Sequence, residues 1–410
     1  MPSIPFSSLG LAEPLLHALE TERFFEPTPI QASTIPPLLA GRDLLGIAQT
    51  GTGKTAAFAL PMLQHLIGSP VRPGNFVTRA LILAPTRELA LQIEQSLRRL
   101  GSSQPLHIVA ILGGVSRFMQ VQRMRRGADI VVGTPGRVCD LMATGELKLN
   151  QVSQFVLDEA DRMLDLGFIR DIRRIVAALP HKRQSALFSA TMPPEVGALA
   201  DSLLRDPLRV DVAQTATAKL PIDQHVHFVE AAGKRALLHR LLVDPALSRV
   251  IVFTRTKRGA NHVAEALETG GVRVVALHGN KSQPARQKAL EQFRRGQARV
   301  LVATDIAARG IDVMGISHVI NFDLPAQPED YVHRIGRTAR AGASGVAISF
   351  CDAAQQGTLR AIERMTGSSL QIAGGSVPRV QLQRTQAQAE NPPSRRRRRK
   401  RAMARVRLAA

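Results

Sequence analysis

Three carboxylates follow an apolar run in the stretch FVLDEADRML, residues 155–164. Asp158, Glu159 and Asp161 come directly after Phe155–Leu157, which is typical of the end of a buried strand. Carboxylates at such a strand end need a partner. A bound cation is one candidate, and the N-terminus of a following helix, where negative charge is also favoured, is the other. The stretch alone does not decide between them.

A glycine-rich segment, AQTGTGKT at residues 48–55, lies between an apolar strand and the helical pattern AAFALPMLQHL. This context is typical of a phosphate-binding loop rather than a plain glycine-rich turn, although Ala48 replaces the first glycine of the general pattern. Lys54 would reach the β- and γ-phosphates, and the Thr55 hydroxyl would hold Mg²⁺. The sequence therefore predicts a nucleotide site whose loop contacts are Thr50, Gly51, Thr52, Gly53, Lys54 and Thr55.

A phosphate loop resolves the choice that the carboxylates left open. Beside such a loop, one acid is needed to bind Mg²⁺ and another to orient the attacking water. We assign Asp158 as the metal ligand, directly or through water, and Glu159 as the catalytic base. The expected ligand is therefore Mg²⁺ bound to a nucleotide, and the resemblance described next implies that this nucleotide is ATP.

The series of motifs around these two segments resembles that of the DEAD-box RNA helicases, and most closely that of their RhlE-like bacterial subfamily. In chain order it reads EPTPIQ, AQTGTGKT, PTREL, GG, TPGR, DEAD, SAT, IVFTRT, TDIAARGID and HRIGRTAR, and the resemblance covers about residues 6 to 350. So many colinear motifs make coincidence negligible. The resemblance implies an α/β fold of two tandem RecA-like domains, each a parallel sheet with helices on both faces, with ATP and RNA held between them.

The resemblance assigns an adenine-reading element to the first of these motifs. Gln31 would hydrogen-bond the adenine, and Phe24 would stack on the base, while Phe6 matches the expected upstream aromatic. Arg23 stands where the family usually has glycine. A surface glutamine and a core phenylalanine are the alternative interpretations.

The resemblance also implies RNA contacts in both halves of the chain, through hydroxyls, arginines and open backbone that suit phosphate oxygens and 2′-hydroxyls. The positions that match are Thr86, Arg87, Gly113, Gly114, Thr134 and Arg137, followed by Thr254, Arg255, Gln283, Arg286, Thr304 and Arg309. Residues that would couple the ATP state to RNA unwinding are Asp161, Ser189, Thr191 and His333. Asp312 matches the residue that holds the ribose hydroxyls.

Three arginines crowd the segment HRIGRTAR, residues 333–340, which has few acids nearby. Cations so close together repel one another unless they share an anion, and a solvated basic helix face is the alternative. Following the resemblance, we assign Arg337 and Arg340 as arginine fingers for the γ-phosphate. Ala339 stands where the family usually has glycine.

The elements that must position these residues alternate along the chain, short β-rich runs with helical patterns. Near-continuous apolar strands separated by helices indicate parallel sheets covered on both faces. Turn residues divide the set at about residues 206–221, and the pattern stops after Gly374. We therefore predict a first domain over residues 1–207, a linker over 208–220, a second domain over 221–374 and a disordered, Arg-rich tail over 375–410.

The formal net charge of +21 favours a nucleic-acid partner over a membrane. From Pro378 to the end of the chain there are eleven Lys/Arg and one acid, Glu390, so this stretch accounts for +10 and the rest of the chain is still basic. Because the chain has no Trp and one Tyr, stacking surfaces for bases are few. The composition therefore favours contacts to the RNA backbone over contacts to the bases.

No apolar stretch approaches the length that spans a membrane. The two cysteines, Cys139 and Cys351, lie far apart and have no metal-site spacing, which fits a reducing compartment. We expect a cytoplasmic monomer that does not contact membranes.

The function predicted from these residues is an RNA-stimulated ATPase. It would locally unwind short RNA duplexes and remodel RNA or RNA–protein complexes by ATP-driven closure of two domains, with ribosome-assembly or RNA-decay complexes as candidate partners. A nucleotide-gated RNA clamp or annealing factor with little strand displacement shares every motif and stays open. A DNA translocase and a polyanion-binding protein with a vestigial ATP site fit the motifs less well.

Overall fold

The computed structural model describes residues 4–49, 51–69, 71–212, 222–308, 313, 315–339 and 344–375. All of them fall within one unit that ends at Gly375, so nearly all of the predicted tail lies outside the described residues. Among the described helices, none is both long and apolar enough to cross a membrane.

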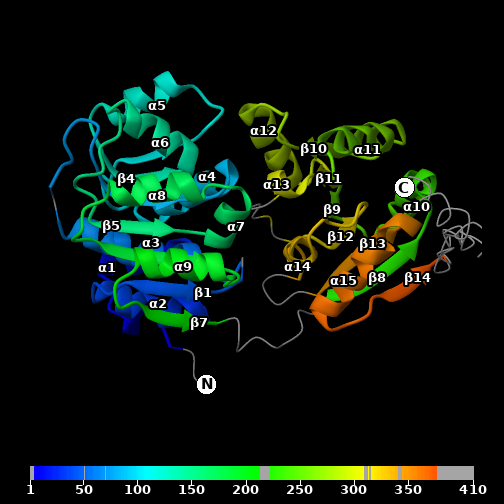
Figure 1. Cartoon of the computed structure of the whole chain (residues 1–410), viewed down its shortest axis with the longest axis horizontal. Coiled ribbons are helices and arrows are strands. Elements are labelled where there is room, and N and C mark those ends of the chain that lie inside the picture. The colour runs from blue at the N-terminus through cyan, green and yellow to red at the C-terminus, as the bar shows by residue number, and fades with distance from the viewer. Residues whose placement is uncertain are drawn as a thin grey trace, which may run out of the picture. The chain divides into compact units, whose positions relative to one another are not determined.

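The first half of the unit is built on a seven-stranded parallel sheet (Figure 1). Its strands are β1 (Leu44–Ile47), β2 (Thr78–Leu83), β3 (Ile108–Ile111), β4 (Ala128–Gly133), β5 (Gln154–Leu157), β6 (Gln184–Ser189) and β7 (Leu208–Asp211). Its helices are η1 (Phe6–Leu9), α1 (Glu13–Thr21), α2 (Pro29–Leu39), α3 (Lys54–Ile67), α4 (Arg87–Leu100), α5 (Arg117–Met124), α6 (Pro135–Ala143), α7 (Ala160–Asp165), α8 (Ile169–Ala177) and α9 (Pro194–Leu203).

The second half is built on another seven-stranded parallel sheet. Its strands are β8 (Ile222–Phe228), β9 (Val250–Phe253), β10 (Val274–Leu277), β11 (Val300–Ala303), β12 (His318–Asn321), β13 (Gly345–Cys351) and β14 (Gln371–Gly374). Its helices are η2 (Ala231–Gly233), α10 (Lys234–Leu241), α11 (Lys257–Thr269), α12 (Gln283–Arg294), α13 (Asp305–Ala308), α14 (Pro328–Ile335), η3 (Ala353–Gln355) and α15 (Gln356–Thr366).

The two sheets share one topology. The first has the order β3-β4-β2-β5-β6-β1-β7, and the second has β10-β11-β9-β12-β13-β8-β14, which is the same order with every number raised by seven. In both sheets the strands are parallel and are joined through helices. The near-continuous apolar runs of the sequence predict this arrangement. The predicted fold class, two parallel sheets with helices on both faces, is confirmed.

Strand β7 corrects the boundary that we drew between the first domain and the linker. The predicted linker began at residue 208, but Leu208–Asp211 pairs in parallel with β1, from Leu44↔Leu208 to Ile47↔Asp211. β7 is a short edge strand with partly exposed side chains, so it lacks the apolar run that marked the other strands. The first sheet therefore extends through Asp211.

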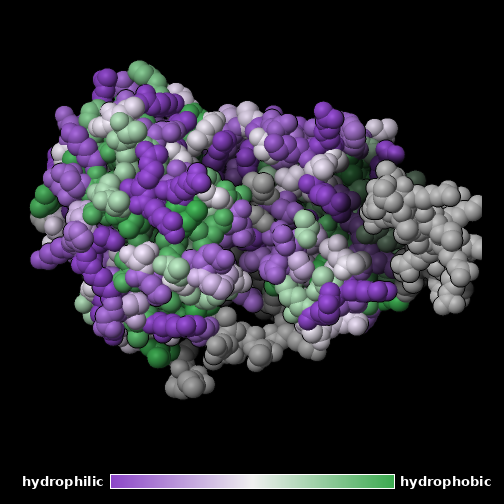
Figure 2. Space-filling view, viewed as in Figure 1, coloured by the Kyte–Doolittle hydropathy of each residue, from purple (hydrophilic) through white to green (hydrophobic). Residues whose placement is uncertain are grey.

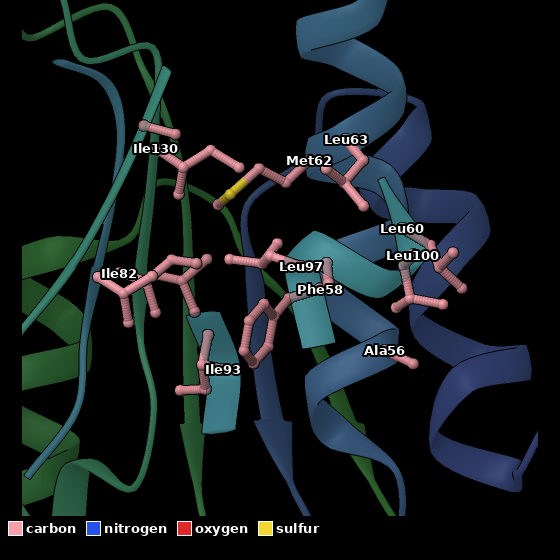
Figure 3. Close-up of a cluster of buried hydrophobic side chains, with 14 of the residues drawn as sticks. Ala56, Phe58, Leu60, Met62, Leu63, Ile82, Ile93, Leu97, Leu100 and Ile130 are labelled. Carbon is pink, nitrogen blue, oxygen red and sulfur yellow. The ribbon is translucent and has the colours of Figure 1, made fainter. Parts of the chain in front are cut away.

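Two apolar clusters fill the two faces of the first sheet because side chains alternate along a strand. On β2, Ile82 packs into one cluster and Leu81 and Leu83 into the other. The first cluster joins β2 and β4 to α3 and α4, with Phe58, Met62, Ile93 and Leu97 among its members (Figure 3). Covered on both faces, the sheet is open for ligands at its edges and at the ends of its strands.

Candidate functional site

The carboxyl ends of parallel strands lie at the same edge of a sheet, and the predicted site residues of the first half gather there. The glycine-rich loop follows β1, the two acids Asp158 and Glu159 follow β5, and Ser189 ends β6. β6 is hydrogen-bonded to both β5 and β1. The nucleotide contacts and the acids are therefore neighbours in space, although about a hundred residues separate them in sequence.

The backbone conformation of the glycine-rich loop requires glycine at two positions. Gly51 and Gly53 have φ of 87° and 92°, in the left-handed region that other residues rarely adopt. A β-carbon at Gly53 would also lie 2.4 Å from Nε2 of Gln31. Lys54 begins α3 and is buried, and its Nζ donates to the Ala48 carbonyl at 3.0 Å.

The remaining loop residues are less constrained in the structure. Thr52 Oγ1 donates to the Gln49 carbonyl at 2.8 Å, and Thr55 is half-buried in the first turn of α3. Thr50 lies outside the described residues. The predicted contacts of this loop with nucleotide stay predictions.

Asp158 and Glu159 are both buried, at 2% and 4% exposure. Oδ1 of Asp158 is buried and has no hydrogen-bond partner among the described residues. Burial raises the pKa of Asp158 to about 6, and the nearby Lys54 offsets part of the rise. A buried carboxylate oxygen without a donor fits a Mg²⁺ ligand, because the ion would supply the missing positive charge.

Asp161, the third acid of the stretch, faces another partner. Its Oδ2 accepts hydrogen bonds from the N–H groups of Ala190 and Thr191, at 3.2 and 2.9 Å, and from the Thr191 hydroxyl at 2.9 Å. Ser189 Oγ accepts from the Asp161 N–H and donates to the Thr191 carbonyl. The DEAD and SAT segments are thus joined directly, and Asp161 does not converge with the other two acids.

No group of three or more His, Cys, Asp or Glu side chains that could hold a metal occurs in the described part of the chain. A Mg²⁺ ion bound with a nucleotide usually takes one or two protein carboxylates and completes its shell from phosphates and water.

The predicted adenine-reading element contacts the phosphate loop. Gln31 Oε1 accepts from the Thr28 N–H at 2.9 Å, which closes the N-terminal cap of α2, and Gln31 Nε2 donates to the Gly53 carbonyl at 3.0 Å. Phe24 is exposed, and Arg23 before it has φ of 61°. The family's usual glycine therefore corresponds to a left-handed position here, which an arginine occupies with some strain.

The predicted RNA contacts of the first half follow β2, β3 and β4. These three strands are neighbours at one end of the strand order, whereas β6 and β1 lie toward the other end. The Arg87 guanidinium lies over Gly114, where a β-carbon would come within 2.3 Å of it. Arg137 donates to the Val115 carbonyl at 3.3 Å. Burial, followed by nearby Arg286, lowers the pKa of Arg87. Cations brought this close together favour an anion such as RNA phosphate.

The two threonines of this group already accept hydrogen bonds. Thr86 Oγ1 accepts from the Leu89 N–H at 3.2 Å as the N-cap of α4, and Thr134 Oγ1 accepts from the Gly113 N–H at 3.4 Å. Each hydroxyl could in addition donate a hydrogen bond to an RNA oxygen.

The corresponding residues of the second half follow the equivalent strands. Thr254 follows β9, Thr304 follows β11, and Gln283 begins α12 after β10. Arg255 is exposed, and its N–H donates to Asp323 Oδ2 at 3.0 Å. Arg309 lies outside the described residues.

Gln283 and Arg286 have a partner that the sequence did not reveal. Both are buried; Gln283 Nε2 donates to Glu88 Oε1 at 3.3 Å, and Arg286 Nη2 lies 2.7 Å from Glu88 Oε2. In this structure these two side chains bind a carboxylate of the first half. In the sequence, the signal for this contact was that Glu88 belongs to the PTREL motif.

Arg334 and Arg337 of the HRIGRTAR segment have different hydrogen-bond partners. Arg334 is fully buried and binds Asp305 through Nε and Nη2, at 2.5 and 2.7 Å. The anion that pairs with Arg334 is therefore a carboxylate of the protein itself, that of Asp305. Arg337 is buried, and its Nε donates to the His333 carbonyl at 3.3 Å. Arg340 and Asp312 lie outside the described residues.

His333 lies close enough to the DEAD segment for Arg162 and Asp161 to affect its pKa. Burial lowers its pKa to about 3, and Arg162 adds to the effect while Asp161 opposes it. Next to it, Arg162 Nη1 donates to Asp330 at 2.8 Å, a contact from α7 to α14. Sequence reasoning missed Arg162 and Asp330, although each is close in the chain to a residue that it did single out.

Comparisons with known proteins agree with this geometry. The family model described as DEAD/DEAH box helicase matches residues 28–199, and the model described as helicase conserved C-terminal domain matches residues 233–342. A protein of Geobacillus kaustophilus named DEAD-box ATP-dependent RNA helicase CshA is 44% identical over 361 residues, which are 88% of this chain and 76% of that protein.

Solved structures have the same fold. S. cerevisiae Dbp5 bound to RNA and ADP BeF3 is similar with a TM-score of 0.81 and 34% identity, over 90% of this chain and 95% of that one. Mss116p bound to ssRNA and AMP-PNP is similar with a TM-score of 0.82 and 28% identity, over 91% of this chain and 80% of that one.

Proposed function

The chain belongs to the DEAD-box family of ATP-dependent RNA helicases, and from that premise we propose that it is an RNA-stimulated ATPase that locally unwinds short RNA duplexes. ATP and RNA would draw its two sheet domains together, and hydrolysis would release them. The RhlE-like subfamily, the cytoplasmic location, the monomeric state and a place in ribosome-assembly or RNA-decay complexes stay predictions from the sequence.

The observation that carries the proposal is the pair of buried acids beside the phosphate loop. Asp158, with its unpartnered Oδ1, and Thr55 would hold Mg²⁺. When bound, the ion would neutralise negative charge on the phosphates. Lys54, whose Nζ now donates to a loop carbonyl, would exchange that acceptor for β- and γ-phosphate oxygens.

Glu159 would orient the attacking water and accept its proton. Its φ of 56° places the residue at the turn between β5 and α7 rather than in either element. Arg337, together with Arg340, would approach the γ-phosphate from the second domain and stabilise the charge that develops during transfer. Gln31, already bound to the Gly53 carbonyl, would connect adenine recognition to the loop.

RNA would bind along the edge that carries Arg87 and Arg137 in the first domain and Arg255 in the second. Contacts to phosphates and 2′-hydroxyls would make binding independent of sequence. The hydrogen bonds of Asp161 to Ala190 and Thr191 would transmit the state of the ATP site to the RNA edge.

The test is ATP turnover with RNA and with DNA of the same sequence. Lys54→Ala should abolish turnover and weaken nucleotide binding. Glu159→Gln should abolish turnover but retain ATP binding and accumulate an RNA-bound state, because only the water-orienting carboxylate is lost. Glu265→Gln, the same change at an exposed position of α11, should behave as wild type.

Hydrolysis by the Glu159→Gln protein at the wild-type rate would refute the assignment of the base. Equal stimulation by DNA would favour a DNA translocase. ATP turnover without strand displacement on a short blunt RNA duplex would favour the clamp or annealing factor.

A further inference from the structure

Helix α5 presents an exposed apolar pair to solvent. Phe118 is 66% exposed and Met119 is 55% exposed. Among the described residues, the only other adjacent pair of exposed large apolar side chains is Phe24 and Phe25, in the predicted adenine element. Contiguous exposed apolar surface often marks an interaction site.

Three exposed arginines follow this pair in the chain. Arg123, Arg125 and Arg126 are exposed, and within the described structure none of these side chains has an ion pair. Residues 113–127 contain no Asp or Glu. Arg117 differs from them because it pairs with Glu146. The surface of α5 is therefore apolar and cationic, without acids of its own.

The helix is fixed to the sheet through its inner face. Gln120 Oε1 accepts from the Leu112 N–H at 2.7 Å, and Gln120 Nε2 donates to the Leu112 carbonyl at 3.0 Å. Met124 is fully buried on the same side. Figure 1 places α5 at one end of the first half, and there Figure 2 shows hydrophobic residues next to strongly hydrophilic ones. The outer side chains thus project from a fixed support.

The same segment is continuous with the predicted RNA contacts. Arg137 donates to the Val115 carbonyl, and Ser116, the next residue, caps the N-terminus of α5. Arg87 lies over Gly114, two residues before that cap. A strand of RNA that passes Arg87 and Arg137 would meet α5 next.

We propose that the α5 patch, defined as Phe118, Met119, Arg123, Arg125 and Arg126, binds single-stranded RNA beyond the contacts assigned to the two domains. Phe118 would stack on a base, and the arginines would contact phosphates. Charge without acids and continuity with Arg87 favour RNA over a protein partner. This inference rests on the proposed function.

The first experiment measures RNA affinity of the full chain for two single strands. One is the shortest strand that gives full ATPase stimulation, and the other is extended at both ends. Phe118→Ala should weaken binding of the extended strand about tenfold, the scale of one base stacked on an aromatic ring. Binding of the short strand should not change. Phe118→Tyr should retain wild-type affinity, and Phe118→Leu should not, because leucine has no π-face.

The second experiment tests the arginines through salt. Arg123→Gln combined with Arg126→Gln should reduce the slope of log K against log salt for the extended strand by about 1.4, because each phosphate contact contributes about 0.7. Arg360→Gln combined with Arg364→Gln removes the same charge from the exposed face of α15 and should leave the slope unchanged.

Equal losses for both strands, or no loss for either, would overturn the inference, as would an equal effect of the α15 control. A wild-type protein that neither binds RNA nor responds to it would refute the proposed function itself. A wild-type protein that responds to RNA, with patch variants that match it, would refute the patch alone. Thermal unfolding of each variant checks that the fold is retained.

Discussion

Asp158 and Glu159 are adjacent in the chain, yet their backbones and surroundings differ. Asp158 follows the end of β5 with a buried, unpartnered carboxylate oxygen. Glu159 has φ of 56° and precedes α7. One backbone turn thus separates the residue proposed to bind Mg²⁺ from the residue proposed to orient water.

The raised pKa of Asp158 predicts how Mg²⁺ dependence changes with pH. Its pKa of about 6 means that the carboxyl gains a proton as the pH falls below that value, and a protonated carboxyl is a poor ligand. The Mg²⁺ concentration for half-maximal turnover should rise about tenfold per pH unit below pH 6. Mg²⁺ titrations of ATP turnover, corrected for protonation of ATP, measure this. A Mg²⁺ requirement that stays flat through this range would remove Asp158 as ligand.

Replacement of Ala339 by glycine should stabilise the fold. Its φ of 53° is left-handed, which costs an L-residue about 1–2 kcal/mol, while glycine loses about 0.5–1 kcal/mol of backbone entropy on folding. Ala339→Gly should therefore raise the free energy of unfolding by up to about 1.5 kcal/mol. Denaturant unfolding measures the change.

The matched control is Ala266→Gly, an exposed alanine inside α11. Because its backbone is helical, this change should lower the free energy of unfolding by about 1 kcal/mol. The same sign for both substitutions would contradict the role assigned to the left-handed backbone.

At the scale of elements, the first turn of α7 is tied to the segment after β6. Asp161 accepts three hydrogen bonds from Ala190 and Thr191. Since α7 directly follows Asp158 and Glu159, a movement at the proposed ATP site would reach the SAT segment through the Asp161 side chain.

Thr191→Val should reduce the coupling between hydrolysis and unwinding. Valine keeps the shape of the side chain but cannot donate to Asp161, a loss of about 1 kcal/mol, or about fivefold in the coupled step. Strand displacement per ATP hydrolysed should fall by that factor, while turnover stays near wild type. Thr191→Ser keeps the hydroxyl and is the control. Wild-type displacement per ATP in Thr191→Val would show that the hydrogen bond is not used.

In the molecule as a whole, two sheets share one topology, and the predicted RNA contacts follow equivalent strands in each. The predicted RNA contacts follow β2, β3 and β4 in the first sheet, and β9, β10 and β11 in the second. Within the described unit, Arg286 with Glu88 and Arg162 with Asp330 join residues of the two halves. Removing one partner of a buried ion pair leaves an uncompensated charge and destabilises strongly, even where the intact pair adds little net stability.

The C-terminal charge predicts a salt effect that leaves the chemistry unchanged. Arg395 to Arg401 are seven consecutive cations, which lie outside the described residues. If about four to six of them neutralise RNA phosphates, deletion of residues 378–410 should flatten the slope of log K against log salt by roughly 3 to 4. RNA binding across a salt series measures this slope.

Turnover at saturating RNA should barely change, because Lys54 and Glu159 lie outside the deletion. An unchanged slope would mean that the charge serves solubility alone. A collapse of saturated turnover would show instead that the tail acts on the ATP site.

The fold class could be predicted from the amino-acid sequence alone, and so could the family. Apolar runs of strand length alternating with helices indicate parallel sheets, and the chemistry predicted for the loop before Lys54 and for Asp158 and Glu159 rests on residue types and spacing. These are local signals, since each depends on residues close together in the chain.

The tertiary structure decided which residues become partners. Glu88 with Arg286, Arg334 with Asp305 and Asp161 with Thr191 are far apart in the chain, and no spacing rule connects them. It also decided that Leu208–Asp211 is an edge strand, because pairing with β1 rather than an apolar pattern forms it. Contacts of this kind depend on the order of strands in a sheet, which the chain fixes only when it folds.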